Sequence, residues 1–340
     1  MKNPLVSIII LNWNGLEHLK SCLPSVIGQT YKNIEIIVVD NGSTDGSVEY
    51  VRQNYDTIKL ACNSTNVGFS KGNNIGIGVA SGKYIAVLNN DTELDQNWVS
   101  SLVDVAEKHP DAGMFACKIL SYYDRNQIDC VGHLIYPDGL SRGRGRGEVD
   151  EGQYDIIEEV AFPSGCAALY RKEMLEQIGL FDERFFIYVE DSDLGMRGRL
   201  AGWKCLYVPN AVVYHKYSAT VGEYSPQKAF LVERNRIWFV VKNFPFTMII
   251  SSFYHTFLRY LFQGYDALFG SGASSKFISN ESKWILISVL FKAYWSALSG
   301  IPEMLRKRRE IHEQKQVTNN EIRRWYRDYR ISVREIALKA

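Results

Sequence analysis

The chain has 340 residues, of which 46% are hydrophobic and 23% are charged, and its formal net charge is +1. This composition is typical of a globular protein with one large or two ordinary domains, and it excludes disorder, a collagen-like chain and a repeat array for the whole chain. The balanced charge disfavours a nucleic-acid binder, and scattered cysteines without a Cys-x-x-Cys pair favour a reducing compartment. The first residues run straight into a strand-like segment, so we expect no signal peptide.

Three continuous apolar, β-branched runs in the first part of the chain predict buried strands, at residues 6–11, 34–39 and 84–88. Helical stretches separate and follow them, at residues 16–27, 47–54, 70–80 and 95–108, and Thr44-Asp45 is placed to cap the second. Apolar strands that alternate with helices are typical of a parallel sheet that is covered on both faces. The sequence therefore predicts an α/β fold with an open sheet flanked by helices.

A polar cluster follows each of these three predicted strands. Asn12-Trp13-Asn14-Gly15 closes the first, Asp40-Asn41-Gly42-Ser43 follows the second, and Asn89-Asn90-Asp91 follows the third. Ligands of open α/β sheets bind beyond the carboxyl ends of the strands, so we expect a binding site at this edge. Ordinary turn and capping chemistry is the alternative for any one cluster, but it explains all three together less well.

Common nucleotide and hydrolase fingerprints are absent from the sequence. No G-x-G-x-x-G follows the first strand, and neither a G-x-x-x-x-G-K-[ST] loop nor a G-x-S-x-G elbow occurs. The glycines within residues 72–78 lie in a helical stretch. These absences disfavour a dinucleotide-binding dehydrogenase, a P-loop NTPase and an α/β-hydrolase.

A series of short motifs resembles glycosyltransferase family 2 in order and spacing. They are VSIIILNWNG at 6–15, VVDNGSTDGS at 38–47, NVGFS at 66–70, LNNDT at 88–92, FPSGC at 162–166 and FFIYVEDSDL at 185–194. The resemblance covers residues 5–240 or so, and bacterial rhamnosyltransferase-type enzymes look most similar. It implies a GT-A fold, inversion at the anomeric carbon, a nucleoside-diphosphate sugar donor and a divalent metal. The FPSGC motif resembles an acceptor-side strand of the family.

The resemblance also assigns roles on the donor side. Asp40 matches the acid that contacts the nucleoside base or ribose, and Asp91 matches the metal-binding position for Mg²⁺ or Mn²⁺. The family often has Asp-x-Asp where this chain has Asn89-Asn90-Asp91, so we expect the metal to bind mainly together with the diphosphate. A helix cap is the alternative for Asp91. The donor-binding candidates are Asn12, Asn14, Asp40, Asn41, Gly42, Asn66, Gly68, Asn73, Asn90 and Arg234.

On the acceptor side, Asp191 matches the base of the family, with Glu190 beside it as a second catalytic candidate. Inversion in one step requires a base that takes the proton of the acceptor hydroxyl, and a carboxylate in a cleft suits this role. A helix begins near residue 190, so capping is the alternative for Asp191, and we expect Asp193 to cap that helix or hold the loop.

Three further features have both a functional and a structural interpretation. His215 follows a β-branched strand and matches a family position that contacts the metal or diphosphate, although a structural role is the alternative. Arg234 and Arg236 could bind a diphosphate or lie on a solvated helix face. The arginines and glycines of residues 141–147 could form a loop that closes on the donor or on an anionic acceptor, or an ordinary surface loop.

The last third of the chain differs in composition from the rest. Residues 236–299 hold 16 of the 43 aromatic side chains, and residues 301–340 carry 11 Lys and Arg against 6 Asp and Glu. We therefore divide the chain into a catalytic domain, 1–235, and an aromatic-rich, basic helical region, 236–340. Its apolar runs, 246–258 and 284–298, are shorter than the roughly 20 residues of a spanning helix.

This composition favours helices that lie in a membrane interface, with the basic clusters at 306–309 and 323–330 against anionic headgroups. A helical subdomain packed on the catalytic domain, an oligomer interface and a hairpin inserted in the bilayer are the alternatives. We expect a peripheral or monotopic protein on the cytoplasmic face of the cell membrane, and we leave a homo-oligomer open.

Together these observations predict an inverting, metal-dependent glycosyltransferase that moves one sugar to a hydroxyl of a lipid-linked or polysaccharide acceptor in cell-envelope glycan synthesis. The subgroup resemblance favours dTDP-L-rhamnose as donor, and a UDP-hexose or UDP-N-acetylhexosamine transferase is the alternative. A non-catalytic sugar-nucleotide or glycan-binding relative is a second alternative. A nucleotidyltransferase is disfavoured because no glycine-rich basic loop follows residues 6–11, and the lack of a Gln-x-x-Arg-Trp motif disfavours processive synthesis.

Overall fold

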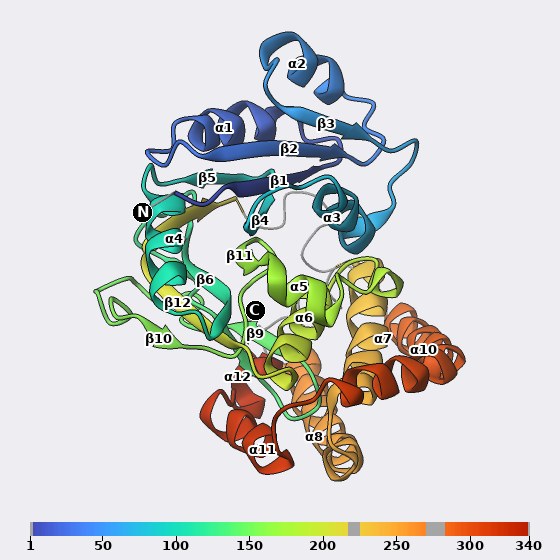
Figure 1. Cartoon of the computed structure of the whole chain (residues 1–340). Helices are drawn as coiled ribbons and strands as arrows, with labels where there is room; N and C mark the ends of the chain where they lie inside the picture. Colours follow the sequence, from blue (N-terminus) through green and yellow to red (C-terminus); the bar gives the residue numbers. More distant parts are fainter. Residues whose placement is uncertain (1–2, 217–224, 270–282, 339–340) are drawn as a thin grey trace. The chain divides into compact units, whose positions relative to one another are not determined.

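The structure is a computed structural model that describes residues 3–216, 225–269 and 283–338 (Figure 1). The chain divides into two compact units. The first takes in Met1–His133, Gly143–Arg199 and Trp203–Tyr217, and the second takes in Leu134–Arg142, Leu200–Gly202 and Ser218–Ala340. This division is based on compactness alone. The predicted boundary between two folding domains at residue 235 stays a prediction.

Ten of the described strands form one mixed sheet, in the order β10-β12-β6-β11-β4-β1-β2-β3, with β5 paired to β12 and β7 to β6. The bounds are β1 Val6–Asn12, β2 Ile34–Asp40, β3 Lys59–Cys62, β4 Tyr84–Asn89, β5 Thr92–Leu94, β6 Ala112–Ser121, β7 Ile128–Cys130, β10 Glu158–Glu159, β11 Ala167–Arg171 and β12 Lys204–His215. Two short strands, β8 (His133–Ile135) and β9 (Ser141–Gly143), pair separately.

One half of the sheet is parallel and the other half is mixed. β3, β2, β1 and β4 run parallel to one another, whereas β11 lies antiparallel between β4 and β6. Beyond it, β12 runs parallel to β6. This is the mixed open sheet flanked by helices that the sequence predicts.

Helices cover both faces of the sheet (Figure 1). Their bounds are α1 Leu16–Ile27, α2 Ser47–Asn54, α3 Gly68–Gly78, α4 Trp98–Lys108, α5 Lys172–Ile178, the 3-10 helix η1 Glu183–Phe185 and α6 Glu190–Leu200. Because side chains alternate along a strand, Ile8 and Ile10 of β1 pack in one buried cluster with α1 and α4, and Ile9 packs in another with α3 and α5. Both faces are therefore buried, which explains why the predicted strands are apolar without alternation.

The predicted elements differ from the structure in a few places. The three predicted strands and four predicted helices are present, but β3 was not predicted. The N-cap of α2 is Gly46 in a left-handed conformation, not Thr44 or Asp45. Asp45 instead accepts hydrogen bonds from the backbone N–H and hydroxyl of Ser47. The FPSGC motif precedes β11 and is not itself a strand.

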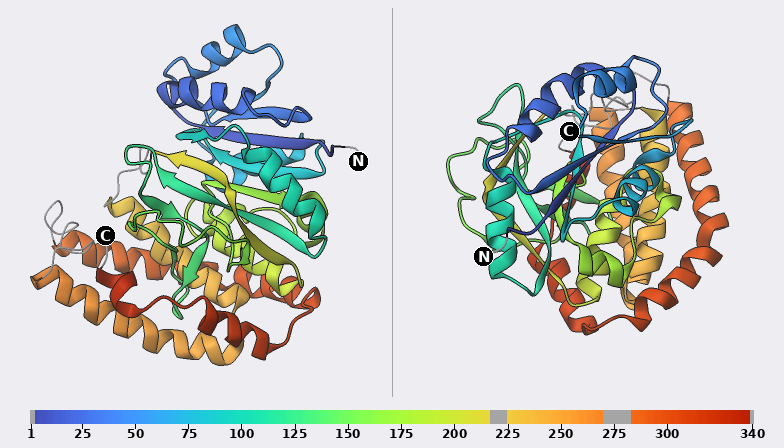
Figure 2. Two further views of the ribbon diagram at one scale, coloured as in Figure 1. Left: turned by 90° about the vertical axis from the view of Figure 1, so that its left-hand side faces the viewer. Right: turned by 45° about the horizontal axis from the view of Figure 1, so that its top comes forward.

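The second unit is helical. Its described helices are α7 Pro226–Asn243, α8 Phe246–Phe269, α10 Lys283–Glu313, α11 Asn319–Asp328 and α12 Val333–Leu338. α7 begins with the Ser225 cap and Pro226, a residue suited to the first helical turn, and α11 begins with a capping box of Thr318 and Glu321. Figure 2 shows α7 and α10 side by side, and α12 packs against α8.

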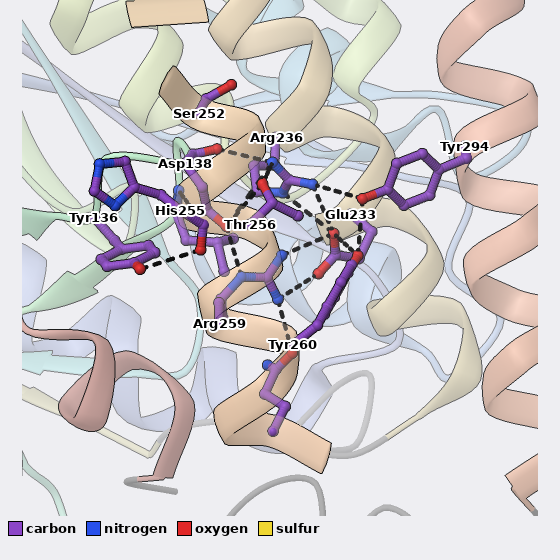
Figure 3. Close-up of polar contacts among 12 residues, drawn as sticks. Tyr136, Asp138, Glu233, Arg236, Ser252, His255, Thr256, Arg259, Tyr260 and Tyr294 are labelled. Atoms are coloured by element: carbon purple, nitrogen blue, oxygen red, sulfur yellow. Dashed lines mark hydrogen bonds and ion pairs between the residues drawn. The ribbon is translucent and has the colours of Figure 1, made fainter. Parts of the chain in front are cut away.

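A buried network of charges holds the second unit together (Figure 3). Arg259 of α8 donates to Asp138 over 2.6 Å and pairs with Glu233 of α7 at 2.8 Å. Arg236 of α7 donates to Glu233 over 3.1 Å and to the Asp138 carbonyl over 2.9 Å, and the Tyr260 hydroxyl donates to Glu233 over 2.9 Å. Two acids balance two arginines, so the buried site carries no net charge, which is the condition under which such groups are tolerated.

Within the described part of the chain, one helix, Trp284–Glu313, is long and apolar enough by length and composition to cross a membrane. The prediction that the apolar run 284–298 is too short to span was wrong on this criterion, because α10 continues without a break through Gly300 and Pro302. Only 22% of its most apolar window is buried.

Candidate active site

The three predicted polar clusters meet at one edge of the sheet. β1, β2 and β4 are parallel and in register, so Asn12 lies opposite Asp40. The Asn12 amide donates to the Asp40 carboxylate over 2.9 Å, and its Oδ1 accepts from the Asn90 amide over 2.7 Å. All three side chains are buried. The structure thus brings these predicted site residues together.

The Asp40 carboxylate organises the turn after β2. It accepts hydrogen bonds from the backbone N–H of Ser43 over 2.8 Å and from the Ser43 hydroxyl over 2.6 Å, in addition to the bond from Asn12. Asn14, at φ +47°, joins the same turn through its N–H, which donates to the Ser43 hydroxyl over 2.8 Å. A carboxylate has about four acceptor positions, so Asp40 retains capacity for one further donor.

A second polar layer surrounds Asn41. Its amide donates to the Gly68 carbonyl over 3.1 Å and to Asn66 over 3.3 Å, and Asn66 accepts from the Gly68 N–H over 2.9 Å. Gly42 has φ +74°, and a Cβ there would lie 2.9 Å from the Thr65 Cα. This contact and the positive φ together require glycine.

Asn73 lies on α3 behind this layer. It is buried and its amide donates to the Phe69 carbonyl over 3.0 Å. Its buried Oδ1 has no hydrogen-bond partner among the described groups. Most buried polar atoms are paired, so Asn73 retains an acceptor for a polar ligand or water.

His215, at the end of β12, joins two buried carboxylates. Its Nδ1 lies 2.7 Å from Asp129 Oδ2, and its Nε2 lies 3.5 Å from Asp91 Oδ1. That oxygen of Asp91 is buried and has no hydrogen-bond partner in the described parts of the chain. The sequence analysis missed Asp129. Its signal is an acid between the apolar residues Ile128 and Cys130, in a strand whose neighbours are buried.

Each member of this triad has a shifted pKa. Burial by itself raises the pKa of Asp91 and of Asp129, but the close contacts and the charge of His215 outweigh it, and both pKa values are lowered. Burial by itself lowers the pKa of His215, but Cys166 and the two carboxylates outweigh it and raise the pKa well above its usual value. A protonated His215 would offset one of the two carboxylate charges.

The residues around Asp91 fit a divalent cation that is held jointly with a diphosphate. Asp91 contributes a buried carboxylate oxygen 3.5 Å from His215 Nε2, and the other nitrogen of the ring contacts Asp129. A carboxylate on the far nitrogen of a metal-binding imidazole is the usual supporting arrangement, because it fixes the tautomer. Among residues 3–216, 225–269 and 283–338, no group of three His, Cys, Asp or Glu side chains is arranged to hold a metal. The remaining ligands would come from substrate oxygens and water.

Asp191 lies in the first turn of α6 and is oriented by backbone N–H groups. Its Oδ2 accepts from Gly165 over 3.1 Å, and its Oδ1 accepts from Ser192 over 2.6 Å. The neighbouring Glu190 is buried, and its Oε2 has no hydrogen-bond partner among the described atoms. Burial and then the charge of Asp191 raise the pKa of Glu190 well above its usual value. Burial therefore favours the protonated form of Glu190, beside the hydrogen-bonded Asp191.

The segment before α6 is strained. Phe186, Tyr188 and Val189 have φ values of +65°, +71° and +69°, a region that side chains other than glycine rarely adopt. Phe186 is held by Ser70, whose N–H donates to the Phe186 carbonyl over 3.1 Å. Gly68 lies so close that a Cβ on it would be 2.5 Å from the Phe186 ring. Such strain persists only where surrounding contacts impose it, and it is concentrated at functional sites.

A backbone hydrogen bond links the Asp91 and Asp191 segments of this edge. The N–H of Asn89, at the end of β4, donates to the carbonyl of Cys166 over 2.8 Å. Asp91 follows Asn89 by two residues, and Asp191 is bound to Gly165, the residue before Cys166. The two acids therefore belong to one connected group of residues.

The other candidates have structural partners. Asp193 forms a buried ion pair with Arg197 at 3.0 Å, which fits the predicted loop-holding role. Arg234 lies on α7 in the second unit, with its guanidinium 4.4 Å from the centre of the Trp238 ring. All the guanidinium nitrogens of Arg236 donate within the buried network, which leaves none for a diphosphate.

Two arginines of the arginine-glycine segment, residues 141–147, contact neighbouring side chains. Arg144 pairs with Glu158 at 2.7 Å and lies over the Tyr154 ring at 4.9 Å. Arg146 Nη2 lies 3.8 Å from Asp129 Oδ1, whereas His215 contacts Oδ2 of the same carboxylate. The segment therefore contributes a second cation beside the triad.

Comparison with known proteins identifies the class of this chain, which is a glycosyltransferase. The chain belongs to Glycosyl transferase family 2, whose pattern matches residues 7–179. The N-acetylglucosaminyl-diphospho-decaprenol L-rhamnosyltransferase of Mycobacterium tuberculosis is 27% identical over 239 residues, which cover 64% of this chain and 78% of the relative. The family predicted from the motifs is confirmed.

Solved structures of glycosyltransferases share the fold. Staphylococcus aureus TarS 1–349 in complex with UDP-GlcNAc matches with a TM-score of 0.56 and 16% identity, covering 96% of this chain and 92% of that chain. GalNAc-T7 with UDP, GalNAc and Mn²⁺ matches with a TM-score of 0.61 and 18% identity, covering 85% of this chain and 57% of that chain. At these identities the likeness shows the GT-A fold alone, and the chain spans little more than half of GalNAc-T7.

Proposed function

We propose that this glycosyltransferase transfers one sugar, with inversion, from a nucleoside-diphosphate sugar to a hydroxyl of a lipid-linked or polysaccharide acceptor of the cell envelope. The observation that carries the proposal is the connected placement of Asp91 and Asp191 through the Asn89–Cys166 hydrogen bond. Reaction by inversion needs a group that holds the leaving diphosphate and a base on the acceptor side, and these two acids supply them.

Asp191 is the proposed base. It takes the proton of the acceptor hydroxyl while that oxygen bonds to the anomeric carbon and the nucleoside diphosphate leaves with the electron pair of the broken bond. Its two N–H donors, Gly165 and Ser192, orient the carboxylate toward the site. Glu190, neutral because it is buried, does not compete for the proton.

Asp91 and His215 are the proposed ligands for Mg²⁺ or Mn²⁺. A divalent cation held there supplies positive charge against the negative charge of the leaving diphosphate. Asp129 positions the imidazole through Nδ1, so that Nε2 faces Asp91. The structure of GalNAc-T7, which shares the fold, contains Mn²⁺.

The donor is proposed to bind at the three strand ends. Asp40 has one acceptor position left for the nucleoside, and Asn73 has an unpaired Oδ1 in the same region of α3 and β2. The similarity to an L-rhamnosyltransferase favours dTDP-L-rhamnose as the donor. The name of that relative states its own acceptor, an N-acetylglucosaminyl-diphospho-decaprenol. A UDP-hexose or UDP-N-acetylhexosamine is the second candidate donor, favoured by the fold shared with TarS bound to UDP-GlcNAc.

The cytoplasmic face of the membrane is the proposed location. The six cysteines all lie in described residues and all are free, which suits a reducing compartment. The apolar helix α10 and the lipid-linked substrate in the name of the mycobacterial relative favour a membrane surface.

The test is donor turnover by the purified full-length protein. Nucleoside diphosphate release is measured with dTDP-L-rhamnose and a panel of UDP-sugars, with Mn²⁺, Mg²⁺ or EDTA, and with membrane lipid extract as acceptor. We expect release from one donor that EDTA, Asp91→Ala and Asp191→Asn abolish and that the exposed-site control Asp104→Asn leaves intact. Release that survives both active-site substitutions contradicts the assigned residues. Tight donor binding without release in the presence of acceptor would support the non-catalytic alternative, and a ladder of products would contradict single-sugar transfer.

A further inference from the structure

Helix α8 exposes its apolar side and buries its polar side. Ser252, Thr256, Arg259 and Asp266 are buried, with Arg259 in the charge network. The opposite side carries large apolar residues that are each more than half exposed and that recur every three or four positions: Phe246, Ile250, Phe253, Phe257, Leu261 and Tyr265. At about 1.5 Å per residue, this stripe extends along most of a 24-residue helix. This arrangement is the reverse of that in a water-soluble helical subdomain.

Helix α10 repeats the pattern. Its small residues Ala293 and Ala297 are fully buried, and α10 packs on α7. The other side presents Trp284, Phe291 and Trp295, with exposed fractions of 79%, 71% and 69%. Exposed apolar patches of this size on a soluble protein mark an interaction surface. The exposed rings are Phe and Tyr on α8 and Trp and Phe on α10, and Trp and Tyr are the residues enriched at membrane–water interfaces.

A basic site adjoins the start of the α8 stripe. Helix α11 buries Ile322, Trp325 and Tyr326 and exposes Arg323, Arg324 and Arg327 on its other side. These three arginines, with Asn320 and Glu321, line an open cavity of about 410 Å³. Arg323 also donates to the Thr247 hydroxyl over 3.1 Å, and Thr247 is the neighbour of the exposed Phe246. Three guanidinium groups and an apolar surface therefore lie next to each other.

We propose that the exposed sides of α8 and α10 form a membrane-docking surface and that Arg323, Arg324 and Arg327 bind the phosphates of anionic lipids at its edge. The inference rests on the membrane location proposed above and adds the surface, the lipid charge and the headgroup site. The three arginines outnumber the nearby acids Glu321 and Asp328, of which Asp328 lies 3.2 Å from Arg327. The remaining positive charge complements anionic headgroups, and guanidinium groups match phosphate oxygens in geometry. The buried Arg259 and Asp266 fix the inner side of α8 to the protein, so the helix lies on the bilayer with its apolar side inserted.

The test is co-sedimentation of the full-length protein with vesicles of phosphatidylcholine alone or with phosphatidylglycerol, at low and high salt. We expect binding to the anionic vesicles that high salt weakens, because exposed charges are screened. A triple variant, Arg323→Gln, Arg324→Gln and Arg327→Gln, is expected to lose at least tenfold of the phosphatidylglycerol-dependent binding. A double variant, Phe253→Ser and Phe257→Ser, is expected to weaken binding to both vesicles. The matched control replaces three exposed cations of the first unit, Lys20, Arg52 and Lys108, by Gln and is expected to bind like wild type.

Other outcomes overturn the proposal in distinguishable ways. Binding that ignores both the anionic lipid and the arginine variant contradicts the headgroup site. A wild-type dimer in solution that binds no vesicles, and that the phenylalanine variant dissociates, assigns the surface to a second copy of the chain. Resistance of membrane-bound protein to carbonate extraction assigns α10 to a spanning role. Donor release measured on the same samples separates the two proposals, since vesicle binding without release in wild type contradicts only the proposed function.

Discussion

Asp129 Oδ2 lies 2.7 Å from Nδ1 of His215, and this contact determines which imidazole nitrogen faces Asp91. A carboxylate on one side of a histidine ring directs the lone pair of the other nitrogen. Asp129 thus acts on the proposed metal site through His215 and is a positioning residue.

Replacement of Asp129 by Asn should weaken the response to metal and leave the fold intact. The amide cannot hold the same tautomer, and loss of such a supporting carboxylate typically costs about 10–100-fold in metal affinity or activity. The measurement is nucleoside diphosphate release against Mn²⁺ concentration, with circular dichroism as the folding control. An unchanged metal response in a variant that has normal stability would contradict this role.

Asp191 and Asp193 should respond differently to the same substitution. Asp191→Asn is expected to lower kcat by about 10²–10⁴-fold, as loss of a general base does, with donor affinity preserved. Asp193→Asn removes the charge that pairs with the buried Arg197 at 3.0 Å, while the three carbonyl contacts of Arg197 remain, and should lower the free energy of unfolding by up to about 3 kcal/mol. Urea denaturation and initial rates on both variants make the comparison, and equal effects of the two substitutions on kcat in stably folded protein would contradict the assignment of the base.

Gly68 should be intolerant of alanine, whereas Gly78 in the same helix should accept it. Gly68 has φ +86°, and a Cβ on it would lie 2.5 Å from the Phe186 ring, but a Cβ on Gly78 would meet nothing within 4 Å. We expect Gly68→Ala to displace the strained segment before α6 and to reduce both donor affinity and turnover. Gly78→Ala should change the free energy of unfolding by about 1 kcal/mol or less, in the stabilising direction. The readouts are donor titration and thermal unfolding.

Acid should destabilise the second unit through Glu233. Burial alone would raise the pKa of this carboxyl, but Arg259 and Arg236 outweigh it and lower the pKa to about 2, from 4.5. A depressed native pKa contributes stability that is complete above the unfolded value and is lost as the pH falls from about 4.5 to about 2. The contribution is on the order of 3 kcal/mol, at 1.36 kcal/mol per pKa unit.

The check on Glu233 is the free energy of unfolding as a function of pH, for wild type and Glu233→Gln. Wild type should lose more stability than the variant over this range. Carbon NMR of the Glu233 carboxyl gives a direct reading that does not depend on the variant folding. Titration of the carboxyl near its usual pKa in the native protein would contradict the network as described.

The sequence predicted the parallel half of the sheet because its strands are buried on both faces and so are apolar throughout. β3 escaped prediction because it has only four residues, Lys59–Cys62, and none of them is fully buried. The strand-end residues Asn12, Asp40 and Asn90 could be placed together for a general reason, which is that parallel strands end at one edge.

The remaining features depend on contacts between distant residues, which no local pattern encodes. Asp129 meets His215 across 86 positions, and Arg259 meets Asp138 across 121. In the sequence, Arg259 looks like the end of an apolar run. In the structure it lies inside α8, which continues to Phe269, because its charge is neutralised by residues of other segments.

The hydrogen bond from Asn89 to Cys166 has a mechanical consequence. It joins β4 to the start of β11, so Asp91 and Asp191 are both held next to one pair of hydrogen-bonded strands. A mutation in this pair that shifted one strand against the other would misalign both acids at once. When the sugar preference of this enzyme is altered by mutation, we therefore expect substitutions in the surrounding loops to be tolerated far better than substitutions at the strand ends.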